Sequence, residues 1–168
     1  MISDFQKRFV LRLFSFTFLL FVFITANAKN PYGAPISLKQ AKTVMATAEA
    51  MAKKNNWNVV ISIVDSGGHL VMSQRLDTTQ FGSIQISLQK AEAAVAFRRP
   101  TALFQELIAK GGKHLRLLNL NNGNASVFEG GVPIIVDGAI IGGIGVSGVA
   151  SSDDAIIAQA GADSLIKK

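Results

Sequence analysis

The chain has 168 residues, of which 49% are hydrophobic and 17% are charged, with two histidines, no cysteine and a formal net charge of +6. This length is enough for one domain with a single core. The absence of cysteine excludes a disulfide scaffold, an iron–sulfur cluster, a thiolate zinc site and a cysteine nucleophile, and two histidines cannot form a three-histidine zinc site.

Residues 1–28 have the features of a secretory signal peptide. Three cations (Lys7, Arg8 and Arg12) precede an apolar run over residues 13–25, which is shorter than the about 20 residues that span a bilayer. Ala26-Asn27-Ala28 then places small residues at the two positions that signal peptidase reads. We expect export to the periplasm or the medium, with no stable membrane anchor after cleavage. An uncleaved N-terminal anchor is the alternative.

Removal of this segment lowers the net charge from +6 to +4, because the segment carries three cations and one acid. The remaining charge is mild, and no pattern of alternating aromatic and basic residues indicates stacking on bases, so we expect no nucleic-acid partner. A cysteine-free exported chain depends on core packing and assembly for stability, which favours a homo-oligomer. Residues 29–35 lack periodicity and are expected to be a flexible arm before a single domain over residues 36–168.

The first half of that domain is expected to contain a helix and a hairpin. Ser37-x-x-Gln40 has capping-box spacing, and apolar residues at helical intervals follow until the polar segment 53–56. Residues 59–64 are apolar and β-branched, which predicts a buried strand, and residues 69–76 predict a second strand. The turn sequence at residues 65–68 joins the two strands.

Two helices are expected next. Helical spacing begins at about Gln80 and is ended by Pro100. A shorter helix begins at Thr101 and stops at Gly111-Gly112, and residues 115–124 are expected to form a loop.

Three short strands follow, over residues 125–128, 133–136 and 139–146, and Asp137-Gly138 predicts a tight hairpin between the last two. Ser151-Ser152-Asp153-Asp154 predicts the start of a final helix that runs to Lys168. The predicted order is therefore α-β-β-α-α-β-β-β-α. Adjacent hairpins imply an α+β fold with an antiparallel five-stranded sheet flanked by helices.

The glycine-rich segment 143–148 matches G-x-G-x-x-G, the pattern of a dinucleotide-binding loop. Only 20 residues remain after Gly148, too few for the second parallel strand of such a unit. We therefore interpret these glycines as positions where the strand passes close to another backbone or to a ligand.

Histidines and arginines are the candidate ligand-binding residues. His69 follows two glycines at the start of a strand and is either a ligand of a metal or heme iron or a hydrogen-bonded turn residue. His114 lies in a basic loop segment. Arg98 and Arg99 end a helix, where they either complement the helix dipole or bind carboxylates or heme propionates. No paired carboxylates indicate acid–base catalysis, so no catalytic residue is predicted.

The segment from about Ile36 to Leu165 resembles the GlcG/HbpS-like heme-binding family and the C-terminal part of PduO-type corrinoid adenosyltransferases. The resemblance rests on separated motifs in the same order: Val64-Asp65-Ser66-Gly67-Gly68-His69-Leu70-Val71, Arg75-Leu76-Asp77, Lys90-Ala91-Glu92, Phe97-Arg98-Arg99-Pro100-Thr101, Gly130-Gly131-Val132-Pro133-Ile134, Ile141-Gly142-Gly143-Ile144-Gly145-Val146-Ser147-Gly148, Asp153-Asp154 and Ala160-Gly161.

This resemblance implies a small profilin-like α/β sandwich that assembles into oligomers and binds heme. By position in the motifs, His69 is a candidate ligand of the heme iron and Thr101 a candidate weak oxygen ligand. The candidate propionate partners are Arg75, Arg98 and Arg99, and His114 is a further candidate for heme contact.

We expect an exported protein that stores, carries or senses heme without turnover, in an apolar slot between a helix and the sheet. The alternative is an enzyme or enzyme accessory that acts on a small anionic metabolite, such as a glycolate-like acid, or on a corrinoid in the same pocket.

Overall fold

The computed structural model describes residues 29–123 and 125–166, and the segment predicted to be a signal peptide lies outside them. Within these ranges the elements are α2 (Leu38–Lys54), β1 (Val60–Asp65), β2 (Leu70–Arg75), α3 (Gly82–Phe97), α4 (Ala102–Ala109), the 3-10 helix η1 (Gly112–Gly123), β3 (Gly131–Val136), β4 (Ala139–Ser147) and α5 (Ser151–Asp163). The α+β class expected from the sequence is confirmed.

The four strands form one antiparallel sheet in the order β2-β1-β4-β3. Both predicted hairpins are confirmed: β1 pairs with β2, and β3 pairs with β4. The β3–β4 turn places Asp137 and Gly138 at φ values of +49° and +77°, as a two-residue turn that matches the strand twist requires. The inner pair, β1 and β4, places Ser62 opposite Gly145.

The prediction of a fifth strand over residues 125–128 is wrong, and the outer edge of β3 gives the physical reason. The Gly131 N–H donates to Thr101 Oγ1 at 2.9 Å, and the Gly131 carbonyl accepts the Thr101 N–H at 3.0 Å. Pro133 has no N–H to offer a further strand. The residue before α4 and a proline thus close the outer edge of β3, as is common for edge strands. In the order of elements along the chain, η1 stands between α4 and β3 in place of the extra strand.

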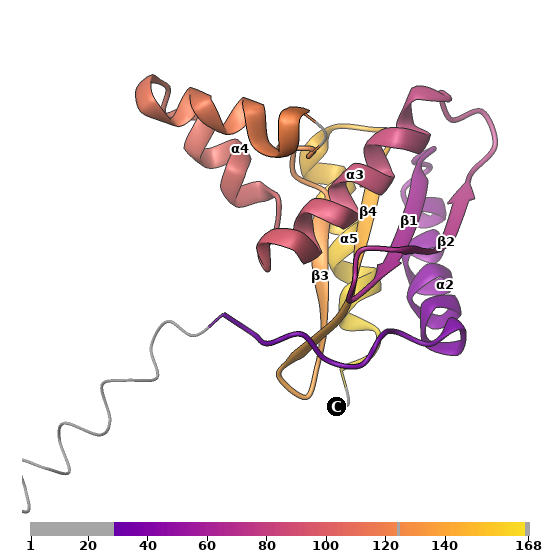
Figure 1. Ribbon diagram of the computed structural model, residues 1–168. Helices are drawn as coiled ribbons and strands as arrows, with labels where there is room; N and C mark the ends of the chain where they lie inside the picture. Colours follow the sequence, from indigo (N-terminus) through magenta and orange to yellow (C-terminus); the bar gives the residue numbers. More distant parts are fainter. Residues whose placement is uncertain (1–28, 124, 167–168) are drawn as a thin grey trace, which may run out of the picture.

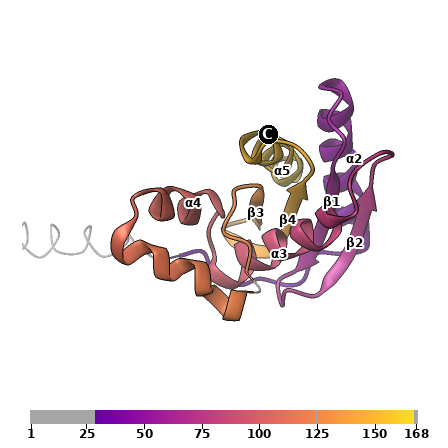
Figure 2. The same ribbon diagram turned by 90° about the horizontal axis from the view of Figure 1, so that it is seen from above.

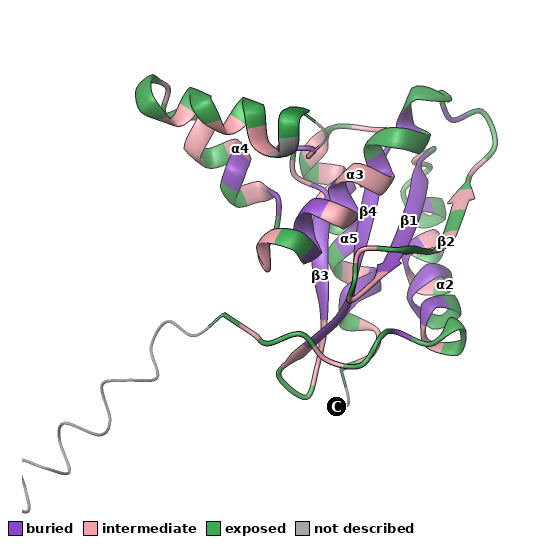
Figure 3. Ribbon diagram, viewed as in Figure 1, coloured by how far each residue is buried: buried purple, intermediate pink, exposed green. Residues whose placement is uncertain are grey.

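Helices cover both faces of the sheet (Figures 1 and 2), with α2 and α5 on one face and α3 on the other. The main core lies between α2, α5 and the sheet, and its fully buried members include Val44, Ala48, Ile61, Ile63, Ile134, Ile144 and Ile157. A smaller cluster of Val64, Ala91 and Val95 lies under α3. The central strands β1 and β4 are almost entirely buried (Figure 3).

The contact between α3 and the sheet is made through glycines. A Cβ added to Gly145 would overlap the Ser87 carbonyl and lie 2.5 Å from the Ala91 nitrogen, and one added to Gly143 would lie 2.7 Å from the Ala91 carbonyl oxygen. The helix backbone therefore rests on the strand backbone, which confirms that the 143–148 glycines serve close approach. This contact leaves no room for an apolar slot between α3 and the sheet at Gly143 and Gly145.

A loop is predicted over residues 115–124, but residues 115–123 are part of η1, and residue 124 lies outside the described residues. Gly111 and Gly112 have φ values of +67° and +56°, which reverse the chain so that η1 returns beside α4. The two helices form a projection from the side of the sheet (Figures 1 and 2). Leu115 and Leu118 of η1 are exposed.

The N-terminal arm, expected to be flexible, is hydrogen-bonded to β4 and α3. Gly33 donates its N–H to the Ile140 carbonyl at 2.8 Å, and Tyr32 Oη donates to the Val95 carbonyl at 2.9 Å. The arm thus joins the start of β4 to the end of α3.

The helix ends agree with the sequence at α2, whereas at α5 the cap and the C-terminal end differ from the prediction. Ser37 and Gln40 form the predicted capping box, with Ser37 Oγ accepting the Gln40 N–H at 3.3 Å and Gln40 Oε1 accepting the Ser37 N–H at 3.0 Å. At α5 the N-cap is Ala150, without a side-chain hydrogen bond, and the helix ends at Asp163 instead of Lys168. The helix begins at Ser151, inside the segment predicted to start it, and Asp153 and Asp154 lie in its first turn.

Candidate functional site

Asp65 organises the turn between β1 and β2. Its Oδ1 accepts hydrogen bonds from the backbone N–H groups of Gly67 at 2.8 Å and His69 at 2.9 Å. Gly68 has a φ of +85°, and a Cβ on Gly67 would lie 2.9 Å from His69 Nδ1. The two glycines therefore permit the turn and leave room for the imidazole.

The His69 imidazole lies at the surface beside a carboxylate. Its side chain is 82% exposed, and Nδ1 lies 3.4 Å from Asp65 Oδ1. A carboxylate on Nδ1 orients a histidine ring and leaves Nε2 as the free ligand nitrogen, an arrangement common among metal-binding histidines. The next residue, Leu70, is also exposed. His69 thus presents a pre-oriented ligand atom next to an apolar side chain.

The same hydrogen bonds make the turn sensitive to acid. They lower the pKa of Asp65, chiefly through the His69 N–H and secondarily through the Gly67 N–H, while partial burial opposes them. Because the folded pKa is below the ordinary value of about 3.9, the stabilisation is present above that pH and is lost as the pH falls through the folded pKa.

We expect Asp65→Asn to lower the free energy of unfolding by about 1 kcal/mol at pH 7, and the difference from wild type to shrink as the pH falls below about 4. Urea denaturation at pH 7, 5, 4 and 3 measures this. The control is Asp77→Asn, an exposed carboxylate that accepts no hydrogen bond within the described part of the chain. A difference that persists unchanged at pH 3 would contradict the assignment.

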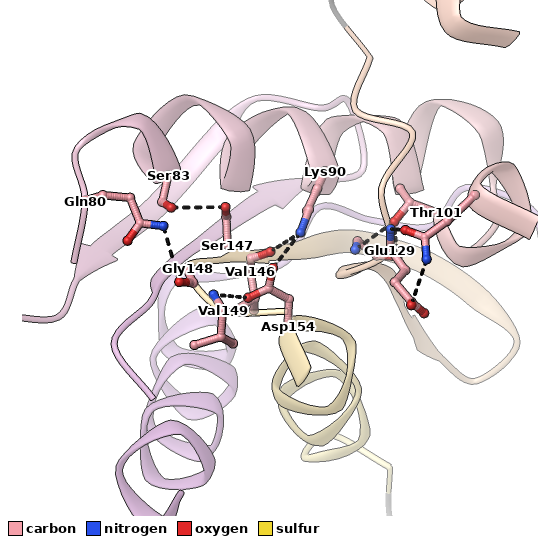
Figure 4. Close-up of polar contacts among 12 residues, drawn as sticks. Gln80, Ser83, Lys90, Thr101, Glu129, Val146, Ser147, Gly148, Val149 and Asp154 are labelled. Atoms are coloured by element: carbon pink, nitrogen blue, oxygen red, sulfur yellow. Dashed lines mark hydrogen bonds and ion pairs between the residues drawn. The ribbon is translucent and has the colours of Figure 1, made fainter. Parts of the chain in front are cut away.

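Thr101, the candidate weak oxygen ligand, does not lie where it could reach a bound group. It is fully buried, and its hydroxyl accepts the Gly131 N–H. Nearby, Gln105 of α4 forms two hydrogen bonds with Glu129, which is labelled in Figure 4. Its Nε2 donates to Glu129 Oε1 at 3.0 Å, and its Oε1 accepts the Glu129 N–H at 3.2 Å. Thr101 therefore joins α4 to the start of β3, and an oxygen ligand at this position would require that joint to open.

Arg75 lies at the far end of β2, in a polar cavity of about 400 Å³. The cavity is lined by Glu49, Lys53, Trp57, Gln74 and Asp77, among others. Its charges are already paired in part, because Lys53 Nζ forms an ion pair with Glu49 at 2.6 Å. This cavity does not include His69.

Arg98 and Arg99 lie together at the end of α3, in a second cavity of about 330 Å³. Arg98 has a φ of +53°, and its guanidinium carbon lies 5.7 Å from the centre of the Tyr32 ring. The Arg99 guanidinium carbon lies 5.9 Å from the centre of the Phe104 ring. Lys29 lines the same cavity, and sequence reasoning missed it because it lies 69 positions away along the chain.

His114 lies on η1, where its N–H donates to the Gly111 carbonyl at 3.2 Å, and it lines neither cavity. The structure therefore brings together Arg98 and Arg99 within one chain, but not His69, Thr101, Arg75 and His114. The contribution of Asp65 was also missed, although the spacing Asp-x-Gly-x-His is a usable signal for it.

Within residues 29–123 and 125–166, no group of three or more His, Cys, Asp or Glu side chains is close enough to hold a metal ion. No helix in these ranges combines the length and the apolarity needed to cross a bilayer.

Both the sequence and the fold are similar to those of known proteins. A family model described as "Haem degrading protein HbpS-like" matches residues 36–163. Protein GlcG of Escherichia coli K12 is 38% identical over 112 residues, which cover 67% of this chain and 81% of GlcG. The corrinoid adenosyltransferase PduO of Salmonella typhimurium is 33% identical over 133 residues, covering 79% of this chain but 40% of that enzyme. The crystal structure of a PduOC–heme complex superposes with a TM-score of 0.73 at 27% identity, covering 79% of this chain and 96% of PduOC.

Proposed function

The chain belongs to the HbpS-like family, and on this basis we propose that it is an exported heme-binding protein that stores, carries or senses heme without turnover. The observation that carries the proposal is the exposed His69 imidazole, oriented by Asp65 at 3.4 Å. The heme in the related PduOC structure supports the choice of ligand. The proposed export rests on the signal-peptide features of residues 1–28.

The residues of this chain fit a heme held at the surface and not one held beneath α3. The backbone of α3 occupies the space over Gly143 and Gly145, so a porphyrin ring cannot enter there without displacing the helix. His69 lies outside that contact and is free to bind iron through Nε2. Bound heme would supply an iron centre whose redox state and ligand exchange depend on the axial ligand.

We propose further that a second copy of the chain completes the site. Binding sites enclose about 70–90% of the surface of a ligand, and a single exposed histidine leaves most of a porphyrin in water. Arg75 shares no cavity with His69 in one chain, whereas a homo-oligomer can bring this cation to the ring from a neighbouring copy.

The test is a hemin titration of the protein that is expressed from the full-length gene and purified after the host cell has processed it. We expect a saturable shift of the Soret band in the wild type, lost or displaced in His69→Ala, and weakened about 10- to 100-fold in Asp65→Asn because the ligand ring loses its orienting partner. The intact mass reports whether the purified chain begins at Lys29.

The histidine on η1 provides the comparison for this titration. His114→Ala is expected to change the Soret band less than His69→Ala, and the reverse order would overturn the assignment of the ligand. Progressive decay of the Soret band with release of iron would contradict binding without turnover. Failure of the wild type to saturate would overturn heme as the ligand.

The second candidate ligand is a small anionic metabolite, such as a glycolate-like acid, or a corrinoid. The paired arginines at the end of α3 and the similarity to PduO favour it. A thermal shift with glycolate or cobalamin, in a protein that does not bind hemin, would support this candidate over heme.

A further inference from the structure

The cavity at the end of α3 combines apolar walls with a group of cations. It lies along the outer edge of β3, between the connection from α3 to α4 and the last turns of α5. Its apolar lining includes Val132, Pro133, Ile135, Ile140, Ala162 and Ile166. Lys29, Arg98 and Arg99 line the same space, and we refer to these three residues as the cationic cluster.

The positive charge of the cationic cluster exceeds what the surrounding protein neutralises. The Phe97 carbonyl, at the end of α3, accepts hydrogen bonds from Lys29 Nζ at 3.4 Å and Arg99 Nε at 3.3 Å. A helix C-terminus is equivalent to only about half a negative charge. Asp163 lines the same cavity as one negative charge against the three positive ones, and its Oδ1 accepts a hydrogen bond from Gln159 Nε2 at 2.7 Å. Of the ion pairs within the described ranges, none includes a member of the cluster.

The surroundings of Lys29 disfavour its charged form. Partial desolvation lowers the pKa of the Lys29 ammonium group, and the positive charges of Arg99 and Arg98 lower it further. An anion placed among the three side chains would relieve this repulsion.

The two guanidinium groups are also held in place. Arg98 adopts the left-handed conformation that glycine usually supplies at the end of a helix, so this position keeps a side chain at a conformational cost. Stacking on Tyr32 and on Phe104 positions the two groups. Apart from Arg99 Nε, which donates to the Phe97 carbonyl, their N–H groups are available to an anion.

We propose that this cavity is a second ligand site, which binds the carboxylate of an amphipathic molecule at the cationic cluster and its apolar body against β3 and α5. Guanidinium forks match the geometry of a carboxylate, and the apolar walls select a ligand with a hydrocarbon part. A fatty acid and a porphyrin propionate share this chemistry. The site is independent of His69, and it goes beyond the proposed heme site.

The experiment is isothermal titration of the processed protein with sodium octanoate. We expect saturable one-to-one binding that is weakened about tenfold or more by Arg98→Gly and by Arg99→Gln, and at least tenfold weaker binding of 1-octanol, which has the tail without the carboxylate. Glycine suits the backbone at position 98, so thermal melting of Arg98→Gly is expected to be close to that of the wild type.

Two variants act as controls for this titration. Arg116→Gln removes the same charge from an exposed position on η1, and His69→Ala removes the proposed heme ligand; both are expected to bind octanoate like the wild type. Simultaneous binding of hemin and octanoate would support two separate sites.

Three results would overturn the proposal: octanoate that does not saturate, equal binding in the Arg98 and Arg99 variants, or loss of octanoate binding in His69→Ala. Displacement of hemin by octanoate would also overturn it, because the cavity would then be the propionate end of the heme site. A protein that binds octanoate but not hemin would retain this proposal while heme binding fails.

Discussion

Gly145→Ala is expected to lower the free energy of unfolding by about 3 kcal/mol or more, a large share of the stability of a domain of this size. The added Cβ would overlap the Ser87 carbonyl and approach the Ala91 nitrogen to 2.5 Å, and it would lie 3.1 Å from Lys90 Cβ. The two closest atoms belong to the backbone of α3, so they cannot move away by changing a rotamer. The helix itself has to shift off the sheet.

Gly82→Ala is the matched control for that substitution. Gly82 is the first residue of the same helix, and a Cβ there would meet nothing within 4 Å. It is expected to leave stability unchanged or raise it by up to about 1 kcal/mol, because alanine favours the helix. Urea denaturation followed by circular dichroism compares the two. A loss below about 1 kcal/mol for Gly145→Ala would show that α3 does not rest directly on the strand.

Local patterns in the sequence were sufficient to predict most of the elements. The Ser37 capping box, the Asp137-Gly138 turn and the apolar run of β1 each depend on residues next to one another in the chain, and all three were located correctly. The prediction of a fifth strand is wrong because it depends on residues that are far apart in the chain. Whether residues 125–128 find a strand to pair with depends on Thr101 closing the edge of β3 from a distant segment.

The candidate site also contains some residues that neighbouring positions in the sequence reveal and others that only the fold brings together. His69 was identified from its place after two glycines, and the hydrogen bonds of Asp65 that fix it span only four residues. The cationic cluster joins Lys29 to Arg98 and Arg99 through the fold alone, so no spacing in the sequence indicates it. The sequence assigns Asp154 only to the start of the final helix, because its partner lies 64 residues away along the chain.

That partner is Lys90, and the pair joins α3, β4 and α5 inside the protein (Figure 4). Lys90 Nζ donates to Asp154 Oδ2 at 2.8 Å and to the Val146 carbonyl at 2.9 Å, and both side chains are almost fully buried. Asp154 Oδ1 accepts the Val149 N–H at 3.2 Å. Burial lowers the pKa of Lys90 and raises the pKa of Asp154, and each partner opposes the shift of the other.

Lys90→Met is therefore expected to lower the free energy of unfolding by about 3–5 kcal/mol, because it leaves the Asp154 carboxylate buried without its counter-charge. Lys53→Met makes the same change in the exposed ion pair with Glu49 and is expected to cost less than about 1 kcal/mol. The double variant Lys90→Met/Asp154→Leu removes both charges, so it should be more stable than the sum of the two single losses predicts, by about 2–3 kcal/mol in a double-mutant cycle. Additive losses would mean that the two side chains stabilise the fold separately, through their contacts with Val146 and Val149, and not as an ion pair.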